Sequence, residues 1–202
     1  NVSKTNKLAY AGIYVPMGSQ FELKGKGTLM LDCYATYGIG IGNDYEHSYG
    51  DITIDMDGSL EIICNGTETV AIGGGFNDDD SDIKLVSGNI KVDMHTHNGI
   101  GVGSFNGDAN IEISDNCKLN MTLAGKRITG IGSFTGISTI GTSADITMSC
   151  SSAEAVGIGV IEDGEGSILV RKGKITAKMN AAKQACIGAI GGSVNTKIMN
   201  AD

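Results

Sequence analysis

The sequence contains no tryptophan, one proline and only two arginines, and its 202 residues carry a net charge of −8. Nucleic acids and anionic membrane surfaces are bound through basic patches, so the shortage of positive charge disfavours both as partners. No apolar run approaches the roughly 18 residues of a membrane-spanning helix, so no membrane insertion is expected. The partners that remain are small molecules, polysaccharides and other proteins.

The chain also lacks the cysteine patterns of disulfide-bonded or metal-binding domains. It has five cysteines, an odd number, and no two of them form a C-x-x-C pair. A complete disulfide framework or a structural zinc site is therefore disfavoured. We expect the cysteines to be buried free thiols that act as small apolar core residues.

Motifs that would name a reaction are missing as well. The sequence has no G-x-S-x-G element, no P-loop and no dinucleotide fingerprint. Its acidic residues offer many carboxylate pairs of the kind that glycoside hydrolases use, but so many exposed acids make such pairs expected by chance. We therefore expect a protein that is not an enzyme, with a polysaccharide lyase or glycoside hydrolase as the enzymatic alternative.

What the chain does have is a repeat. The dipeptide Ile-Gly returns at intervals of about 30 residues, a period typical of stacked-repeat architectures. The six copies that form this series begin at Ile39, Ile72, Ile100, Ile131, Ile158 and Ile187.

Each repeat contains three short segments in which apolar and polar residues alternate. In the second repeat these segments are Gly38–Gly42, Ile52–Ile54 and Leu60–Ile62, separated by Gly, Asn and Asp. Such segments are typical of strands joined by turns. Strands this short need partners above and below, which stacking in register provides. The sequence predicts an all-β, single-domain, right-handed parallel β-helix over residues 1–202, with three short strands per coil and about six coils of roughly 29 residues. A β-sandwich is the weaker alternative, because it would not produce this long period.

The glycines of the repeat are the first candidate binding surface. If each repeat isoleucine points inward, the glycines beside it point outward and leave a strand face without side chains. Such a face suits close approach by a polymer, a second chain or a neighbouring domain. Alternatively, the coil bends here and needs permissive backbone angles. The candidate residues are Gly40, Gly73, Gly101, Gly132 and Gly159.

The aromatic residues are the second candidate. All six tyrosines lie in residues 10–49, and tyrosine rings suit sugar binding because they combine a stacking face with a hydroxyl. The candidate patch is Tyr34, Tyr37, Tyr45 and Tyr49; the alternative is that these residues shield the open end of the first coil. Phe76, Phe105 and Phe134 recur with the repeat, which predicts a packed phenylalanine ladder.

The acidic loops are the third candidate. They follow the Gly-rich strands, and carboxylate oxygens are the ligands that Ca²⁺ prefers. The sequence nominates a calcium site at Asp78, Asp79, Asp80 and Asp82, although no EF-hand pattern is present. The alternative is a solvated acidic edge that binds no ion.

One stretch resembles a known family. Tyr37-Gly38-Ile39-Gly40-Ile41-Gly42, followed by Gly50-Asp51-Ile52-Thr53-Ile54, is similar to the Gly-Ile-Gly repeats of β-helical modules in cell-surface proteins of Gram-positive, mostly gut-dwelling anaerobic bacteria. The resemblance covers residues 11–199. It implies an extracellular or cell-surface location and a carbohydrate-binding or adhesive role.

Together these features predict a non-catalytic extracellular binding or adhesion module that recognises a polysaccharide or another surface macromolecule. A structural spacer or self-association module is the alternative. Neither end carries an obvious polar cap, so we expect a module of a larger protein, with flanking domains or a homo-oligomer covering its ends.

Overall fold

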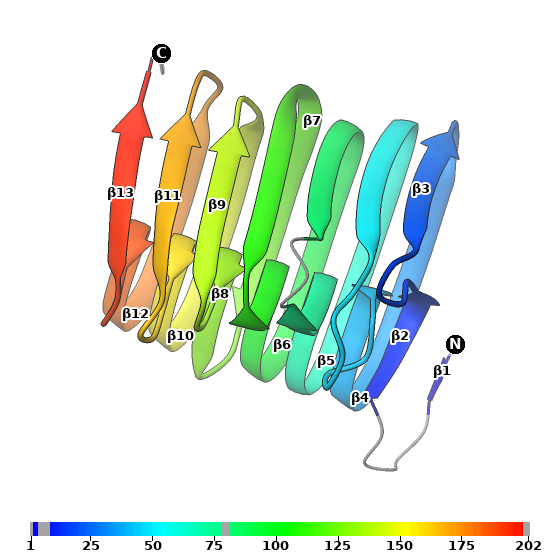
Figure 1. Cartoon of the computed structure of the whole chain (residues 1–202), viewed down its shortest axis with the longest axis horizontal. Helices are drawn as coiled ribbons and strands as arrows, with labels where there is room; N and C mark the ends of the chain where they lie inside the picture. Colours follow the sequence, from blue (N-terminus) through cyan, green and yellow to red (C-terminus); the bar gives the residue numbers. More distant parts are fainter. Residues whose placement is uncertain (1, 4–8, 78–80, 200–202) are drawn as a thin grey trace.

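The computed structural model describes residues 2–3, 9–77 and 81–199, and this part of the chain contains strands and no helix. The chain winds into a β-solenoid of about six turns of roughly 29 residues each. Figure 1 shows the turns stacked side by side along the long axis, from the N-terminal turn to the C-terminal turn. None of the described segments forms a helix long and apolar enough to cross a membrane.

The thirteen strands form one continuous sheet. They are β1 (Val2–Ser3), β2 (Ala9–Tyr14), β3 (Gln20–Gly25), β4 (Thr28–Gly42), β5 (Asp51–Asn77), β6 (Asp82–Gly107), β7 (Ala109–Ala124), β8 (Arg127–Ser133), β9 (Ile137–Thr142), β10 (Asp145–Val160), β11 (Glu165–Val170), β12 (Ile175–Ala189) and β13 (Ser193–Ile198).

Neighbouring turns pair in parallel, and like residues stack on like. One column of register partners runs Ile52, Ile83, Ile111, Ile140 and Ile168. Each of these isoleucines is buried, so the column forms part of a continuous apolar core. The predicted parallel β-helix is confirmed, and among the described residues every pair of neighbouring strands is parallel, without the antiparallel hairpins that a sandwich would need.

The three predicted segments of a turn are often fused into one long, bent strand. β5 carries all three segments of the second turn, and β6 carries all three of the third. The fusion arises because register pairing continues round the corners, as between Asn65 and His95 and between Glu68 and Asn98. The chain leaves the sheet mainly in the loops that follow the Gly-rich segments.

The Gly-rich segments are residues 37–42, 68–74, 98–104, 127–133, 154–160 and 183–189. In every turn but the last they are largely buried on both faces, by two separate clusters, whereas residues 183–189 of the last turn are exposed or only partly buried. The main core fills the inside of the solenoid and includes Ile41, Ile72 and Ile131. A smaller outer cluster covers the other face and consists of Ile39, Val70, Ile100, Phe105, Phe134, Val156 and Ile161. Phe105 lies near the end of β6 and Phe134 lies in the loop after β8, and both rings pack over this outer face.

Several acidic side chains bind the next turn instead of standing free in solvent. The Oδ1 atoms of Asp51, Asp108 and Asp145 each accept a hydrogen bond from a backbone N–H one turn further along, at 3.0–3.1 Å. The Arg171 guanidinium reaches further and donates to the Glu112 carboxylate at 2.6 Å, two turns away. The three aspartates thus satisfy backbone N–H groups of the neighbouring turn.

Candidate functional site

The glycine face is not a docking surface. Gly40, Gly73, Gly101, Gly132 and Gly159 are all buried, so the prediction that they form an exposed strand face is wrong. Two of them point into the main core: a Cβ on Gly40 would lie 2.7 Å from Cγ2 of Ile62, and one on Gly101 would lie 2.8 Å from Sδ of Met121. These glycines make room for large side chains from the opposite wall.

The other three glycines sit where the chain turns the corner. Gly73, Gly132 and Gly159 have φ values of 126°, 131° and 138°, a region that side-chain-bearing residues rarely adopt. A Cβ on any of them would lie within 2.0 Å of a carbonyl oxygen of the next turn. The alternative reading, that the coil bends here and needs permissive angles, is the one the geometry supports.

The Ile-Gly dipeptide also occupies two different columns. Ile72, Ile131 and Ile158 face the main core, whereas Ile39 and Ile100 belong to the outer cluster. Register pairs Ile39 with Val70 and Ile41 with Ile72, so the same dipeptide is shifted by two residues between turns. The premise that every repeat isoleucine points inward fails for this reason.

The predicted tyrosine patch is divided among three places. Tyr49 is fully buried in the main core, and Tyr34 is 52% exposed on the outer side of the third segment. Tyr37 and Tyr45 are half-buried and lie together, with ring centroids 4.7 Å apart and planes 34° apart. Of the four predicted tyrosines, only Tyr37 and Tyr45 therefore lie together and form a candidate binding surface.

An aromatic row extends from this pair along the solenoid. The Tyr45 ring lies 5.6 Å from Phe105, and Phe105 meets Phe134 edge-on at 4.7 Å. The predicted packing of Phe105 and Phe134 is confirmed, because both are nearly fully buried in the outer cluster. Phe76 is not part of the ladder; it lines a separate hollow of about 410 Å³ together with Tyr14 and Met17.

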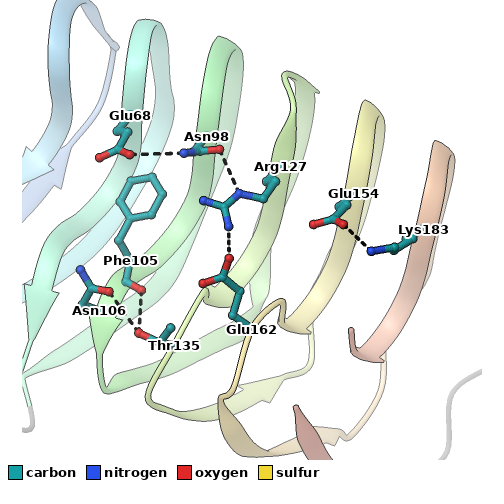
Figure 2. A network of polar contacts seen from close by, with 9 residues as sticks. All are labelled: Glu68, Asn98, Phe105, Asn106, Arg127, Thr135, Glu154, Glu162 and Lys183. Carbon is teal, nitrogen blue, oxygen red and sulfur yellow. Dashed lines mark hydrogen bonds and ion pairs between the residues drawn. The ribbon is translucent and has the colours of Figure 1, made fainter. Parts of the chain in front are cut away.

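A row of polar side chains borders the aromatic row. We call Glu68, Asn98, Arg127, Glu154 and Lys183 the polar row; they are successive register partners, one on each turn. Tyr37 is the register partner of Glu68 and extends the row onto the first turn. Figure 2 shows the five side chains projecting from neighbouring strands on one side of the solenoid.

Arg127 is the most connected member of the polar row. Its Nε donates to Oδ1 of Asn98 at 3.2 Å, and its Nη1 donates to the carboxylate of Glu162 on a loop (Figure 2). Its guanidinium carbon also lies 5.3 Å from the Phe134 ring centroid, within reach of a cation–π contact. Asn98 in turn donates to Glu68 at 3.3 Å, and Lys183 donates to Glu154 at 2.8 Å. The side chains are held in place before any ligand arrives.

Tyr45 links the aromatic row to the polar row. Burial, and then a hydrogen bond with Glu68, raise the pKa of the Tyr45 hydroxyl above its usual value of 10.0. The hydroxyl therefore stays protonated and donates a hydrogen bond to the Glu68 carboxylate. The combined surface offers the half-buried rings of Tyr37 and Tyr45, hydrogen-bond donors and acceptors, and both signs of charge along one line.

The polar row was missed at the sequence level because its members share no residue type. Repeat detection finds identical residues at a fixed interval, whereas this row contains two acids, two bases and an amide. The signal that could have found it is position: each residue begins the Gly-rich segment of its turn.

The calcium prediction gains no support in the described part of the chain. Asp78, Asp79 and Asp80 lie outside the described residues. Asp82 is described, and its carboxylate contacts Lys84 at 2.6 Å and the amide of Asn110. Among the described residues, no group of three or more His, Cys, Asp or Glu side chains is arranged to hold a metal ion.

The buried Tyr49 predicts a pH dependence of stability. Burial raises the pKa of the native phenol above its usual value of 10.0, whereas the unfolded phenol ionises near that value. The contribution of Tyr49 to the free energy of unfolding is therefore fully present below about pH 10. It is lost as the pH rises above this value, by up to about 1.4 kcal/mol per pH unit. We expect Tyr49→Phe to flatten the fall in the free energy of unfolding between pH 10 and 11, measured by urea titration. Tyr34→Phe is the control for an exposed phenol. Equal pH dependence in the wild type and Tyr49→Phe would contradict this assignment.

Comparison with models of known protein families, with curated proteins and with solved structures found no match. The class of protein is therefore defined by the fold and the site: a parallel β-solenoid with an aromatic row and a polar row along one lateral face.

Proposed function

We propose that the protein is a non-catalytic module that binds a polysaccharide along the aromatic and polar rows. The observation that carries the proposal is the half-buried Tyr37–Tyr45 ring pair, continuous with five register-aligned polar side chains. Sugar rings present apolar faces that stack on aromatic rings and hydroxyls that exchange hydrogen bonds with amides, carboxylates and cations. In this protein, aromatic rings and polar side chains of these kinds lie next to each other.

The spacing of the polar row favours an extended chain over a single sugar. Register partners in neighbouring turns lie about 4.8 Å apart, so five of them span about 19 Å along the solenoid axis. A polymer lying parallel to this axis meets one polar side chain per turn. We therefore expect affinity to rise with the number of sugar units until the row is filled.

The charge of the surface favours a polysaccharide with little net charge. Glu68, Glu154 and Glu162 are offset by Arg127 and Lys183, and most of these groups are already paired. A strongly anionic polymer would meet the three carboxylates, and a strongly cationic one would meet the two bases. In line with the sequence resemblance, we place this activity outside the cell.

The test is affinity electrophoresis of the protein in gels containing β-glucan, xylan, mannan or pectin. We expect retardation by at least one uncharged polymer, and about fivefold weaker binding for Tyr37→Ala and Tyr45→Ala, because a ring contact is worth about 1 kcal/mol. Tyr34→Ala removes an exposed tyrosine from another face and is the matched control. Circular dichroism verifies that each variant is folded.

Three outcomes would contradict the proposal. The first is no retardation by any polymer, and the second is equal weakening by Tyr34→Ala and Tyr37→Ala. The third is release of reducing sugar from a retarding polymer, which would make the protein a hydrolase or lyase.

A further inference from the structure

Two cysteines on neighbouring turns lie side by side in the main core. Cys33 of β4 and Cys64 of β5 are register partners, and their relative exposures are 7% and 0%. Neighbouring strands are about 4.8 Å apart, which falls within the roughly 4.4–6.8 Å between Cα atoms that a disulfide spans. Both side chains point to the same interior, and an approach of the two Cβ atoms by a few tenths of an ångström brings them within the roughly 3.5–4.5 Å that a disulfide requires.

The other cysteines lack such a partner. Cys117 pairs in register with Gly88, and Cys150 lies between Leu123 and Met179. Cys186, on the last turn, is exposed. Cys33 and Cys64 are the only two thiols that are register partners; Cys186 lies near enough to Cys150 to help raise the pKa of that thiol, but it is not the register partner of Cys150.

We propose that Cys33 and Cys64 are a modification site: exposure to a small-molecule disulfide converts them from two thiols into one disulfide that joins the first two turns. The inference is independent of the proposed sugar binding. It concerns residues of the main core that the aromatic and polar rows do not use.

The reaction is two successive thiol–disulfide exchanges. The Cys33 thiolate attacks a sulfur of the small disulfide, forming a mixed disulfide and expelling one small thiolate. The Cys64 thiolate then attacks Sγ of Cys33, which forms the protein disulfide and expels the second small thiolate. The two protein thiols lose two electrons and two protons in all; the small disulfide accepts them and leaves as two thiols.

The environment of the pair determines the order and the rate. The hydrogen bond with Cys33 and burial raise the pKa of the Cys64 thiol, whereas the same hydrogen bond lowers the pKa of Cys33. Cys33 is therefore the first nucleophile, and it is also the less buried of the two. Because Cys64 must lose its proton in the second step, the bond should form faster as the pH rises.

The bond would hold the first turn onto the second. In stacked repeats, each turn contacts only its neighbours, so the outermost turns open first. The new link closes a long loop and removes conformations from the unfolded chain. We expect a rise in the midpoint of thermal unfolding of about 5–10 °C for a link of this length in a domain of this size.

The experiment uses the full chain carrying Cys186→Ser, which removes the exposed thiol and leaves four of the five cysteines. The reduced protein is incubated with oxidised glutathione at pH 8.5, then denatured and alkylated, and the alkyl groups are counted by mass spectrometry. We expect two alkyl groups in place of four, and a linked peptide containing Cys33 and Cys64 after digestion without reductant. Cys33→Ala and Cys64→Ala, each in the same background, should prevent the cross-link and the rise in thermal midpoint. Cys117→Ala should leave both intact.

Four alkyl groups after prolonged oxidation would overturn the proposal, as would a linked peptide that contains Cys117 or Cys150. Stable mixed disulfides with glutathione at Cys33, without progress to the cross-link, would also overturn it, because they would show that the second thiol cannot reach the first. Circular dichroism of each alanine variant shows whether the turns remain stacked. If an alanine variant does not fold, the linked peptide from the parent protein decides the question alone.

Discussion

Gly132→Ala is expected to unfold the protein or to lower the free energy of unfolding by more than about 4 kcal/mol. Two costs combine at this position. The φ of 131° is strained for alanine, and the new Cβ would lie 2.0 Å from the carbonyl oxygen of Gly159. That oxygen belongs to the backbone of the next turn, so it cannot move without opening the stack.

Gly188→Ala is the matched control for this variant. Gly188 has the same φ of 131° in the last turn, but a Cβ there would meet no atom within 4 Å. It should therefore show the conformational cost alone, about 1–3 kcal/mol. Urea unfolding followed by circular dichroism measures both variants. Equal losses would mean that the close approach of neighbouring turns contributes nothing.

Ile131→Ala is expected to lower the free energy of unfolding by about 3–5 kcal/mol. Ile131 is fully buried in the main core, between turns on both sides, so its removal costs transfer energy and leaves a cavity that the stacked strands cannot fill. The same urea titration measures this loss.

Ile187→Ala tests whether the loss depends on burial between turns. Ile187 belongs to the same column as Ile131 but is only partly buried in the last turn. We expect a loss of about 1–2 kcal/mol, because little cavity is left where solvent already has access. A loss at Ile187 as large as at Ile131 would contradict the view that stacking on both sides sets the stability of each rung.

Much of the architecture could be predicted from the sequence. Alternating segments such as Ile52–Ile54, repeated at a long period, admit few folds, because each short strand needs a partner and identical residues stack best on each other. The parallel register of Ile52 with Ile83 and of Cys33 with Cys64 confirms that logic. The cysteine prediction is also confirmed for Cys33, Cys64, Cys117 and Cys150, which are buried free thiols; Cys186 is free but exposed.

The candidate sites were harder to predict. The alternation of apolar and polar residues indicates which residues share a face of a strand, but it does not indicate what packs over that face. The glycines were expected at the surface, but Gly40 and Gly101 point into the main core, and the other three candidates lie against the backbone of the next turn. The tyrosines were grouped by their closeness in sequence, yet a buried loop takes Tyr49 into the core and a corner separates Tyr34 from Tyr37.

The sequence by itself determined that the chain is a parallel β-solenoid whose turns stack around an apolar interior. The alternation of side chains along each strand and the length of the repeat can both be seen directly in the sequence. Only the tertiary structure decided which side chains come together on one exposed face. The polar row exists because residues about 30 positions apart, from Glu68 to Lys183, come into line when the turns stack. The physical reason is that register between turns depends on loop lengths, bulges and corner angles, all of which are settled by the packing of the whole solenoid.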